Sequence, residues 1–529
     1  MKNNTLVVLD ITSPIEKESF DNIVFEENTL FLPITPYAYY VLEGHKYNLI
    51  RFSEYYSPEY IRDIMLELTK KLNNILESCG LEYLAYNMKL VKIINLFSYS
   101  LLIKKIVNKY QEKNYEVEYI TDRRKYSEDM DVLNTSTTLL EALIVFDKLT
   151  YFEKKKVQIN KGRWKYISLF LLYNKIRYRK LFQYDWLSIK PNFSVHKINY
   201  ISNIVKNNKI NEFFNANFEG NNLLLTIFEK YLYQNVRLNN IKSTNFFVFA
   251  SSLTFFSMIY LRQKKEKIFC FQHGSYYYHH STRWYESEIL KVNEIKLSDV
   301  NFVFNDFTKK IFQDLGAKNV YSVGSVLFNR KIREKKKTFD YIYITQGHDY
   351  SGNSQYVDFP NSLHSFDGFE LYERHKGIIE LFGTKLHDKN ILIRVHPCVV
   401  SSGVYVPFWE LTKQYKNITI DVSSSIHTLI EKSKYIISDY FTTEFINREL
   451  HYKRDILLFK GAPTPLLDET LEEMKKMFIL VDDIEELKEK IENIDDIVKN
   501  RERDDDIIEY YSSKKCDTQK TIRKILKKE

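Results

Sequence analysis

Short apolar runs alternate with amphipathic segments through the second half of the chain. After residue 245, runs of four or five mainly apolar residues are followed by segments whose apolar positions recur every three or four residues. This alternation predicts buried strands joined by helices, and therefore a parallel sheet covered by helices. The strands are expected at 246–250, 267–271, 301–305 and 320–323, and the helices at 252–262 and 308–315.

A second series of the same kind begins after a charged segment, 330–337, that is poor in apolar residues. Such a segment predicts a domain boundary near residue 335. A helical segment, 482–494, is expected to close the second domain, and the chain after residue 496 is expected to cross back onto the first. The expected strands are 340–345, 391–395, 418–422, 435–438 and 455–459, and the expected helices are 373–382, 426–433 and 442–450.

The N-terminal part mixes strand-like and helical segments, which also indicates an α/β structure. The predicted fold class is α/β, with two doubly wound, Rossmann-like domains that face each other across a cleft and extra helices in the N-terminal half. The predicted domains are 1–335, with helical insertions, 336–495, and a basic helical tail, 496–529. The expected N-terminal strands are 6–10, 30–33 and 46–50, and the expected helices are 60–79 and 93–111.

Composition narrows the class of protein. With 44% hydrophobic and 15% aromatic residues among 529, the chain is not disordered, and only 14 Gly and 10 Pro exclude collagen-like and low-complexity architectures. Its four cysteines lie far apart, which favours neither a zinc site nor a disulfide framework and fits a reducing cytosol. The first apolar run, 6–9, is too short for a signal-peptide core, and the longest, 246–261, is too short to span a bilayer. We therefore expect a cytoplasmic protein.

Positive charge is concentrated in two segments, although the net charge is only +8. Segment 151–190 is basic and aromatic, as in proteins that bind single-stranded nucleic acid. The tail, 514–528, is basic with Ile522, Ile525 and Leu526 at helical spacing, as in helices that lie on an anionic membrane surface. A solvated basic helix face explains either segment at least equally well.

Two of the expected strands end in histidine. Strand 267–271 is followed by Gln272-His273-Gly274, and strand 391–395 leads into His396-Pro397, where the proline favours extended backbone for His396. Ligands of open α/β sheets bind at the carboxyl ends of the strands, so both imidazoles are candidates for one cleft. A structural role is the alternative for each histidine alone.

Hydroxyl groups follow two further strands. Strand 435–438 is followed by Asp439 and by Thr442 and Thr443 at an expected helix start, and Ser423–Ser425 precedes the helix at 426. Free backbone N–H groups at a helix start can bind an anion, whereas plain N-capping is the alternative. No glycine-rich phosphate loop is present, which argues against an NTPase or a nicotinamide enzyme. Neighbouring histidines at 279 and 280 are weak metal-ligand candidates, so neither a metal nor a cofactor is expected.

The order and spacing of these motifs resemble those of GT-B-type transferases that use cytidine-nucleotide-activated donors for bacterial surface polymers. The likeness covers residues 246–459 and extends to the CDP-glycerol glycerophosphotransferases and the polysialic-acid and Kdo capsule transferases. The glycerophosphotransferases carry a tryptophan-histidine-glycine turn, an arginine-leucine-histidine-proline-like strand end, an aspartate-tyrosine-serine-serine turn and a glycine turn. The corresponding residues here are Gln272-His273-Gly274, Arg394-Val395-His396-Pro397, Asp439-Tyr440-Phe441-Thr442 and Gly324-Ser325.

The resemblance implies roles for these residues. His273 would take the proton from the acceptor hydroxyl, since imidazole has an ordinary pKa near 6.5, and His396 would offset charge on the departing nucleotide. Residues 1–335 would then form the acceptor side and 336–495 the donor side, with no metal required. A surface ion pair is an equal alternative to donor binding for Arg394. A favourable charge at a helix start is an equal alternative to nucleotide binding for Glu444. The expected donor-binding residues are Gln272, Gly274, Gly324, Ser325, Arg394, Pro397, Ser424, Ser438, Asp439, Thr442, Thr443 and Glu444.

The sequence therefore favours a glycosyltransferase whose partners are a CMP- or CDP-activated sugar and a glycan or lipid-linked acceptor, with peripheral contact to an anionic membrane left open. Gln272 and Phe441 depart from the glycerophosphotransferase pattern, which argues against glycerol phosphate as the transferred group. A CDP-glycerol or CDP-ribitol polyol-phosphotransferase is the first alternative. A nucleic-acid-binding protein that uses segment 151–190 is the second, and otherwise no nucleic acid is expected.

Overall fold

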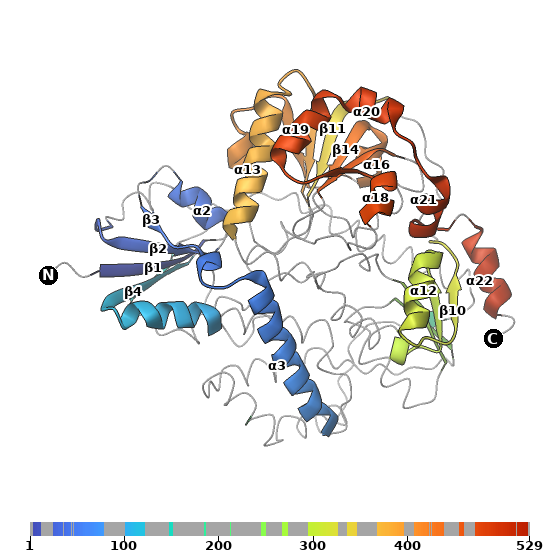
Figure 1. Ribbon diagram of the computed structural model, residues 1–529, viewed down its shortest axis with the longest axis horizontal. Coiled ribbons are helices and arrows are strands. Elements are labelled where there is room, and N and C mark those ends of the chain that lie inside the picture. The colour runs from blue at the N-terminus through green and yellow to red at the C-terminus, as the bar shows by residue number, and fades with distance from the viewer. Residues whose placement is uncertain are drawn as a thin grey trace.

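The computed structural model contains three parallel β-sheets (Figure 1). We call them the N-terminal, middle and C-terminal sheets. The structure describes residues 4–11, 25–34, 36–43, 45, 47–78, 101–121, 148–151, 185–186, 212, 245–249, 267–272, 295–325, 336–345, 368–395, 407–422, 424, 426–438, 454–459, 471–514 and 516–526.

The N-terminal sheet has the strand order β3-β2-β1-β4-β5, so the direction of winding reverses between β1 and β4. Val7 and Leu9 of β1 pack against Tyr37 and Val41 of helix α2 in one buried cluster. The strands are β1 (Asn4–Asp10), β2 (Thr29–Pro33), β3 (Asn48–Leu49), β4 (Tyr115–Thr121) and β5 (Lys148–Tyr151). The other elements are α2 (Pro36–Leu42), the 3-10 helix η1 (Phe52–Glu54), α3 (Pro58–Ser78) and helical residues 101–111.

The middle sheet has its five described strands in the order β10-β9-β8-β7-β6, without a reversal. Helix α12 (Asp306–Asp314) follows β9, and its N-cap Asn305 accepts a hydrogen bond from Thr308 N through its side chain at 2.8 Å. The strands are β6 (Asp185–Trp186), β7 (Asn245–Phe249), β8 (Lys267–Phe271), β9 (Val300–Val303) and β10 (Val320–Ser322).

The C-terminal sheet has the order β13-β12-β11-β14-β15-β16, which is the Rossmann order 3-2-1-4-5-6. Apolar side chains cover both faces: Ile393 and Ile437 lie in one cluster, and Leu392 and Ile436 in the other. The strands are β11 (Phe339–Ile344), β12 (Ile391–Arg394), β13 (Ile418–Asp421), β14 (Ser433–Ser438), β15 (Ile456–Phe459) and β16 (Ile479–Val481). The helices are α13 (Gly368–Thr384), α15 (Phe408–Thr412), α16 (Ile426–Glu431), α18 (Leu471–Met477), α19 (Ile484–Glu492) and α20 (Ile494–Asn500).

The predicted α/β class with parallel sheets is confirmed, but the first 335 residues hold two sheets where one domain was predicted. An apolar run identifies a buried strand without identifying the strand beside it, so the pattern could not divide these strands between two sheets. The predicted helices 252–262 and 442–450 lie outside the described residues, and a cleft between the two predicted domains stays a prediction.

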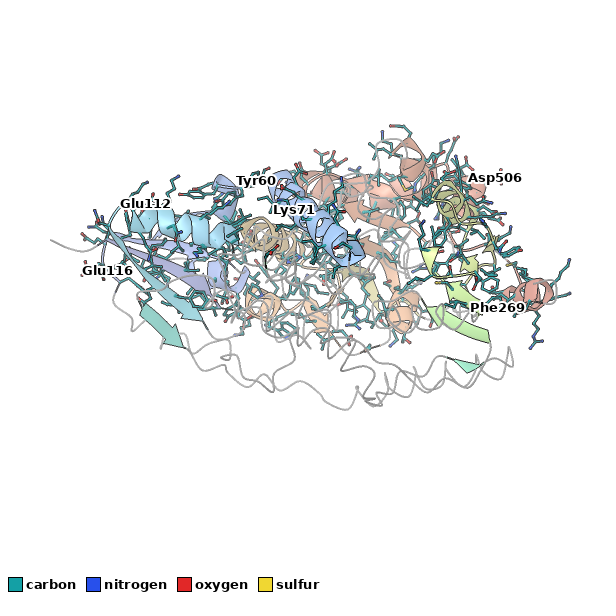
Figure 2. The ribbon with its side chains drawn as sticks, turned by 90° about the horizontal axis from the view of Figure 1, so that it is seen from below. Tyr60, Lys71, Glu112, Glu116, Phe269 and Asp506 are labelled. Carbon is teal, nitrogen blue, oxygen red and sulfur yellow. The ribbon has the colours of Figure 1, made fainter. Side chains whose placement is uncertain are left out.

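The C-terminal segment crosses back to the middle sheet, as predicted. After α21 (Asp505–Tyr511), Lys514 N donates to Phe304 O at 2.8 Å, and helix α22 (Thr518–Leu526) packs beside Phe269 (Figure 2). Ile522 is fully buried in that contact, and Ile525 and Leu526 pack against the same cluster. Ile522 therefore packs on the middle sheet and is not available to a membrane surface, and contact of the basic tail with a membrane stays a prediction. Of the chain that the structure describes, no helix is long and apolar enough to cross a bilayer.

The N-terminal sheet is joined to the C-terminal sheet through helices α2 and α13, which lie side by side (Figure 1). Glu43, just after α2, accepts hydrogen bonds from Tyr372 Oη and Lys376 Nζ of α13. The guanidinium of Arg51 lies 3.7 Å from the ring centroid of Phe369 in the first turn of α13. Helix α2 and the residues near it therefore contact α13 beside the C-terminal sheet, although Glu43 and Tyr372 lie 329 residues apart in sequence.

Candidate active site

The strand order of the C-terminal sheet reverses between β11 and β14, so the crevice for a ligand is expected outside the carboxyl ends of these two strands. Four residues lie in register across that edge, namely Asp421, Arg394, Ile344 and Ser438. Two of the four, Arg394 and Ser438, were candidates in the sequence. The fold therefore brings the predicted strand ends of residues 391–395 and 435–438 to one edge.

Ser438 occupies the reversal point itself. Its side chain is fully buried, and its Oγ donates to the carbonyl oxygen of Ile344 at 3.4 Å. This hydroxyl therefore bridges β14 and β11 at their last residues. The structure shows it holding the two strands together, and its contact with a donor stays a prediction.

Arg394 is buried at the end of β12, with 5% of its surface exposed. Its Nη1 donates to Val395 O at 2.6 Å and to Asp421 O at 3.2 Å, and its Nε lies 3.7 Å from Asp421 Oδ1. Arg394 thus pairs with a carboxylate, which was one of the two alternatives, but the pair is buried and not on the surface.

Ser424 is held by the same carboxylate. Its N–H donates to Asp421 Oδ1 and its Oγ donates to Asp421 Oδ2, both at 2.7 Å. Sequence reasoning missed Asp421, although an aspartate three residues before a serine is a recognised pattern for a side chain that caps a turn.

Gln272 lies at the carboxyl end of the middle sheet, with 1% of its surface exposed. Its Oε1 accepts a hydrogen bond from Phe304 N at 2.8 Å, and its own N–H donates to Phe302 O at 3.0 Å. Both groups join the ends of β8 and β9. This side chain therefore fixes the strand end that immediately precedes His273.

Gly324 and Ser325 face the C-terminal segment. Gly324 has a φ of +70°, and a Cβ at this position would lie 2.5 Å from Lys514 O. Ser325 N donates to Ser513 Oγ at 2.9 Å. These contacts explain the glycine by close packing of two chain segments, and a donor contact by either residue stays a prediction.

The remaining candidates lie outside the described residues: His273, Gly274, His396, Pro397, Asp439, Thr442, Thr443 and Glu444. Within the part of the chain that the structure describes, no three His, Cys, Asp or Glu side chains form a group that could hold a metal ion. The expectation that the protein needs neither a metal nor a cofactor stays a prediction.

No protein-family model and no curated protein matches the chain. Solved structures with a loose likeness include the UDP-GlcNAc 2-epimerase of Methanocaldococcus jannaschii in complex with UDP-GlcNAc and UDP, with 13% identity, a TM-score of 0.38 and coverage of 81% of this chain and 97% of that chain. The trehalose 6-phosphate synthase of Burkholderia multivorans has 11% identity, a TM-score of 0.33 and coverage of 78% and 96%. A mutant of TarM from S. aureus in complex with UDP has 13% identity, a TM-score of 0.33 and coverage of 58% of each chain. Likenesses of this extent identify neither a family nor an activity.

Proposed function

We propose that the protein is a glycosyltransferase that moves a sugar from a CMP- or CDP-activated donor to a glycan or lipid-linked acceptor. One observation carries the proposal: the Rossmann-ordered C-terminal sheet aligns the ends of β12 and β14 in register beside its reversal point. The residues that follow these ends in the sequence are His396-Pro397 and Asp439. These are the positions at which the sequence resembles the cytidine-dependent transferases.

In the proposed reaction, the acceptor hydroxyl oxygen attacks the anomeric carbon of the donor sugar. A new C–O bond forms to the acceptor, and the bond between the anomeric carbon and the nucleotide phosphate oxygen breaks, with its electron pair left on that oxygen. His273 takes the acceptor proton as general base. His396 offsets the negative charge that develops on the departing nucleotide.

Release of the nucleotide from the donor, as CMP, CDP or UDP, tests this proposal. The purified protein is incubated with CMP-Kdo, CMP-sialic acid, CDP-glycerol and a UDP-sugar, with and without a glycan acceptor. We expect turnover of a cytidine-activated sugar, and His396→Ala should lower it by about 100-fold or more, as loss of a charge-stabilising group does.

His387 provides the matched control, because it is exposed and its Nδ1 lies 3.2 Å from Thr384 O at the end of α13, away from the strand ends. His387→Ala should keep wild-type turnover. Turnover of CDP-glycerol alone would indicate the polyol-phosphotransferase, and turnover of the UDP-sugar alone would contradict cytidine dependence. Full activity of His396→Ala would contradict the role of that histidine.

A further inference from the structure

The backbone of Val395 is fixed on both sides before the chain reaches His396. Val395 N donates to Asp421 O at 3.1 Å, and Val395 O accepts from Arg394 Nη1 at 2.6 Å. A peptide unit is planar, so the carbonyl of residue 395 and the N–H of residue 396 share one rigid plane. Fixing this carbonyl therefore fixes the peptide plane that precedes residue 396.

The same guanidinium ties that backbone to the next strand. Arg394 Nη1 also donates to Asp421 O at 3.2 Å, and Arg394 and Asp421 are register partners on β12 and β13. Both side chains are largely buried, with 6% and 17% of their side-chain surface exposed. Burial of a charge raises the free energy of the folded state unless the charge is paired and hydrogen-bonded. The Arg394–Asp421 pair is therefore favoured in the one geometry that keeps these contacts.

Asp421 extends the connection to the start of α16. Its two carboxylate oxygens accept from the N–H and the Oγ of Ser424, each at 2.7 Å. One partly buried network therefore joins Arg394 and Val395, which precede His396 in the sequence, to the turn that contains Ser424.

We propose that Arg394 and Asp421 are positioning residues for the transfer reaction, which act through His396 without touching the donor. This inference rests on the proposed function. The resemblance placed Arg394 among the expected donor-binding residues, with an ion pair as the equal alternative. The contacts direct its guanidinium along the sheet edge to Val395 and Asp421.

Substitution of Arg394 by lysine tests the proposal while retaining the positive charge. An ammonium lacks the planar fork of a guanidinium and cannot reproduce the contacts to Val395, Asp421 O and Asp421 Oδ1 together. We expect kcat for nucleotide release to fall by about 10- to 100-fold, as expected for a small misplacement of a reacting group. The KM for the donor should change much less than kcat.

A double-mutant cycle with His396→Ala shows whether the effect passes through His396. In the His396→Ala background, Arg394→Lys should have little further effect on single-turnover release, because no imidazole is left to position. Asp421→Asn, which keeps the side-chain oxygen but loses the charge, should follow the same pattern with a smaller loss. If Arg394→Lys does not fold, Asp421→Asn replaces it in the double-mutant cycle with His396→Ala.

Arg454 is a matched control at the opposite edge of the same sheet. Its Nη2 also bridges two carbonyl oxygens, of Ile430 at 3.2 Å and Ser433 at 2.6 Å. Arg454→Lys should lower the urea midpoint of unfolding to a similar extent as Arg394→Lys and leave kcat unchanged.

The outcomes separate this proposal from the function on which it rests. Equal losses in both backgrounds, equal kcat losses for the two arginine variants, or a raised KM with unchanged kcat would each contradict positioning while the transferase function stands. A wild-type protein that turns over no nucleotide donor contradicts the proposed function itself, and the positioning role with it.

Discussion

Two junctions connect distant parts of this chain, and they differ in chemistry. At the first, α2 meets α13 through one aromatic pair, Tyr39 and Phe369, and through the charged and hydroxyl groups of Glu43, Tyr372 and Lys376. At the second, α22 meets the middle sheet through fully buried Ile522 and a cluster of phenylalanines. Ion pairs near the surface are screened by salt and contribute little, whereas buried apolar contacts are part of the core. The second junction should therefore behave as part of the fold, and the first as a contact that solution conditions can weaken.

The largest effect is expected from shortening Ile522 in the apolar junction. Ile522→Ala leaves a cavity among Phe269, Phe302 and Val323, and should lower the free energy of unfolding by about 2–5 kcal/mol. Ile525→Ala is the control at a partly buried position one turn later, and should have a smaller effect. Equilibrium unfolding in urea measures both. A loss at Ile525 that equals the loss at Ile522 would contradict the placement of α22.

A second prediction concerns the close approach of the C-terminal segment to Gly324. Gly324→Ala places a Cβ 2.5 Å from Lys514 O, whereas a Cβ added to Gly316, whose φ is +94°, would have no heavy atom within 4 Å. Both substitutions cost about 1–2 kcal/mol for left-handed backbone. Only Gly324→Ala adds overpacking of about 1–3 kcal/mol, so the difference in the free energy of unfolding isolates the contact. Faster amide exchange in residues 518–526 should accompany Gly324→Ala alone, and equal effects of the two variants would argue against the contact.

The sequence predicted the strands of the C-terminal sheet closely. Residues 340–345, 391–395 and 435–438 correspond to β11, β12 and β14, because parallel strands that are buried on both faces form continuous apolar runs. Strand β16, Ile479–Val481, was missed, although it ends a run of five apolar residues, 477–481. This run begins at the last residue of helix α18, Leu471–Met477, and periodicity alone cannot distinguish a short apolar strand from a buried helix segment. The helix predicted at 482–494 corresponds to α19, Ile484–Glu492, and a further helix, α20, follows directly with Asn493 as its N-cap residue.

The candidate site was less predictable, since its contacts join residues that are distant in sequence. The apolar run 391–395 correctly predicts a strand that ends close to Arg394, but the partner of Arg394, Asp421, lies 27 residues further along the chain. Likewise, nothing in the sequence around Gly324 indicates a contact with Lys514. Local pattern shows which residues reach an edge, whereas tertiary pairing decides whether a side chain there faces a ligand or another strand.

The smallest effect is expected at the polar junction, where it should depend on pH. Burial and the hydrogen bond to Glu43 raise the pKa of Tyr372 above its ordinary value of 10.0. A tyrosine whose pKa is raised by folding contributes its full stabilisation of the folded state below pH 10. Above pH 10 the tyrosine loses its proton in the unfolded state but keeps it in the folded state. The contribution is therefore lost as the pH rises further.

Tyr372→Phe removes that hydroxyl, and should weaken the junction by about 1 kcal/mol at pH 8. It should also reduce the fall in stability of the α2–α13 contact above pH 10. Both effects are measured as the urea concentration at which the N-terminal sheet and α2 separate from α13. Small-angle X-ray scattering at pH 8 and pH 10.5 follows this separation. Tyr110→Phe is the control, because the pKa of Tyr110 is also raised, to about 12, by burial and a hydrogen bond with Tyr55, but this tyrosine lies away from α13. Tyr110→Phe could change the urea midpoint of this separation as much as Tyr372→Phe does. The pH dependence would then arise from the N-terminal sheet and its helices as a whole and not from the contact between α2 and α13.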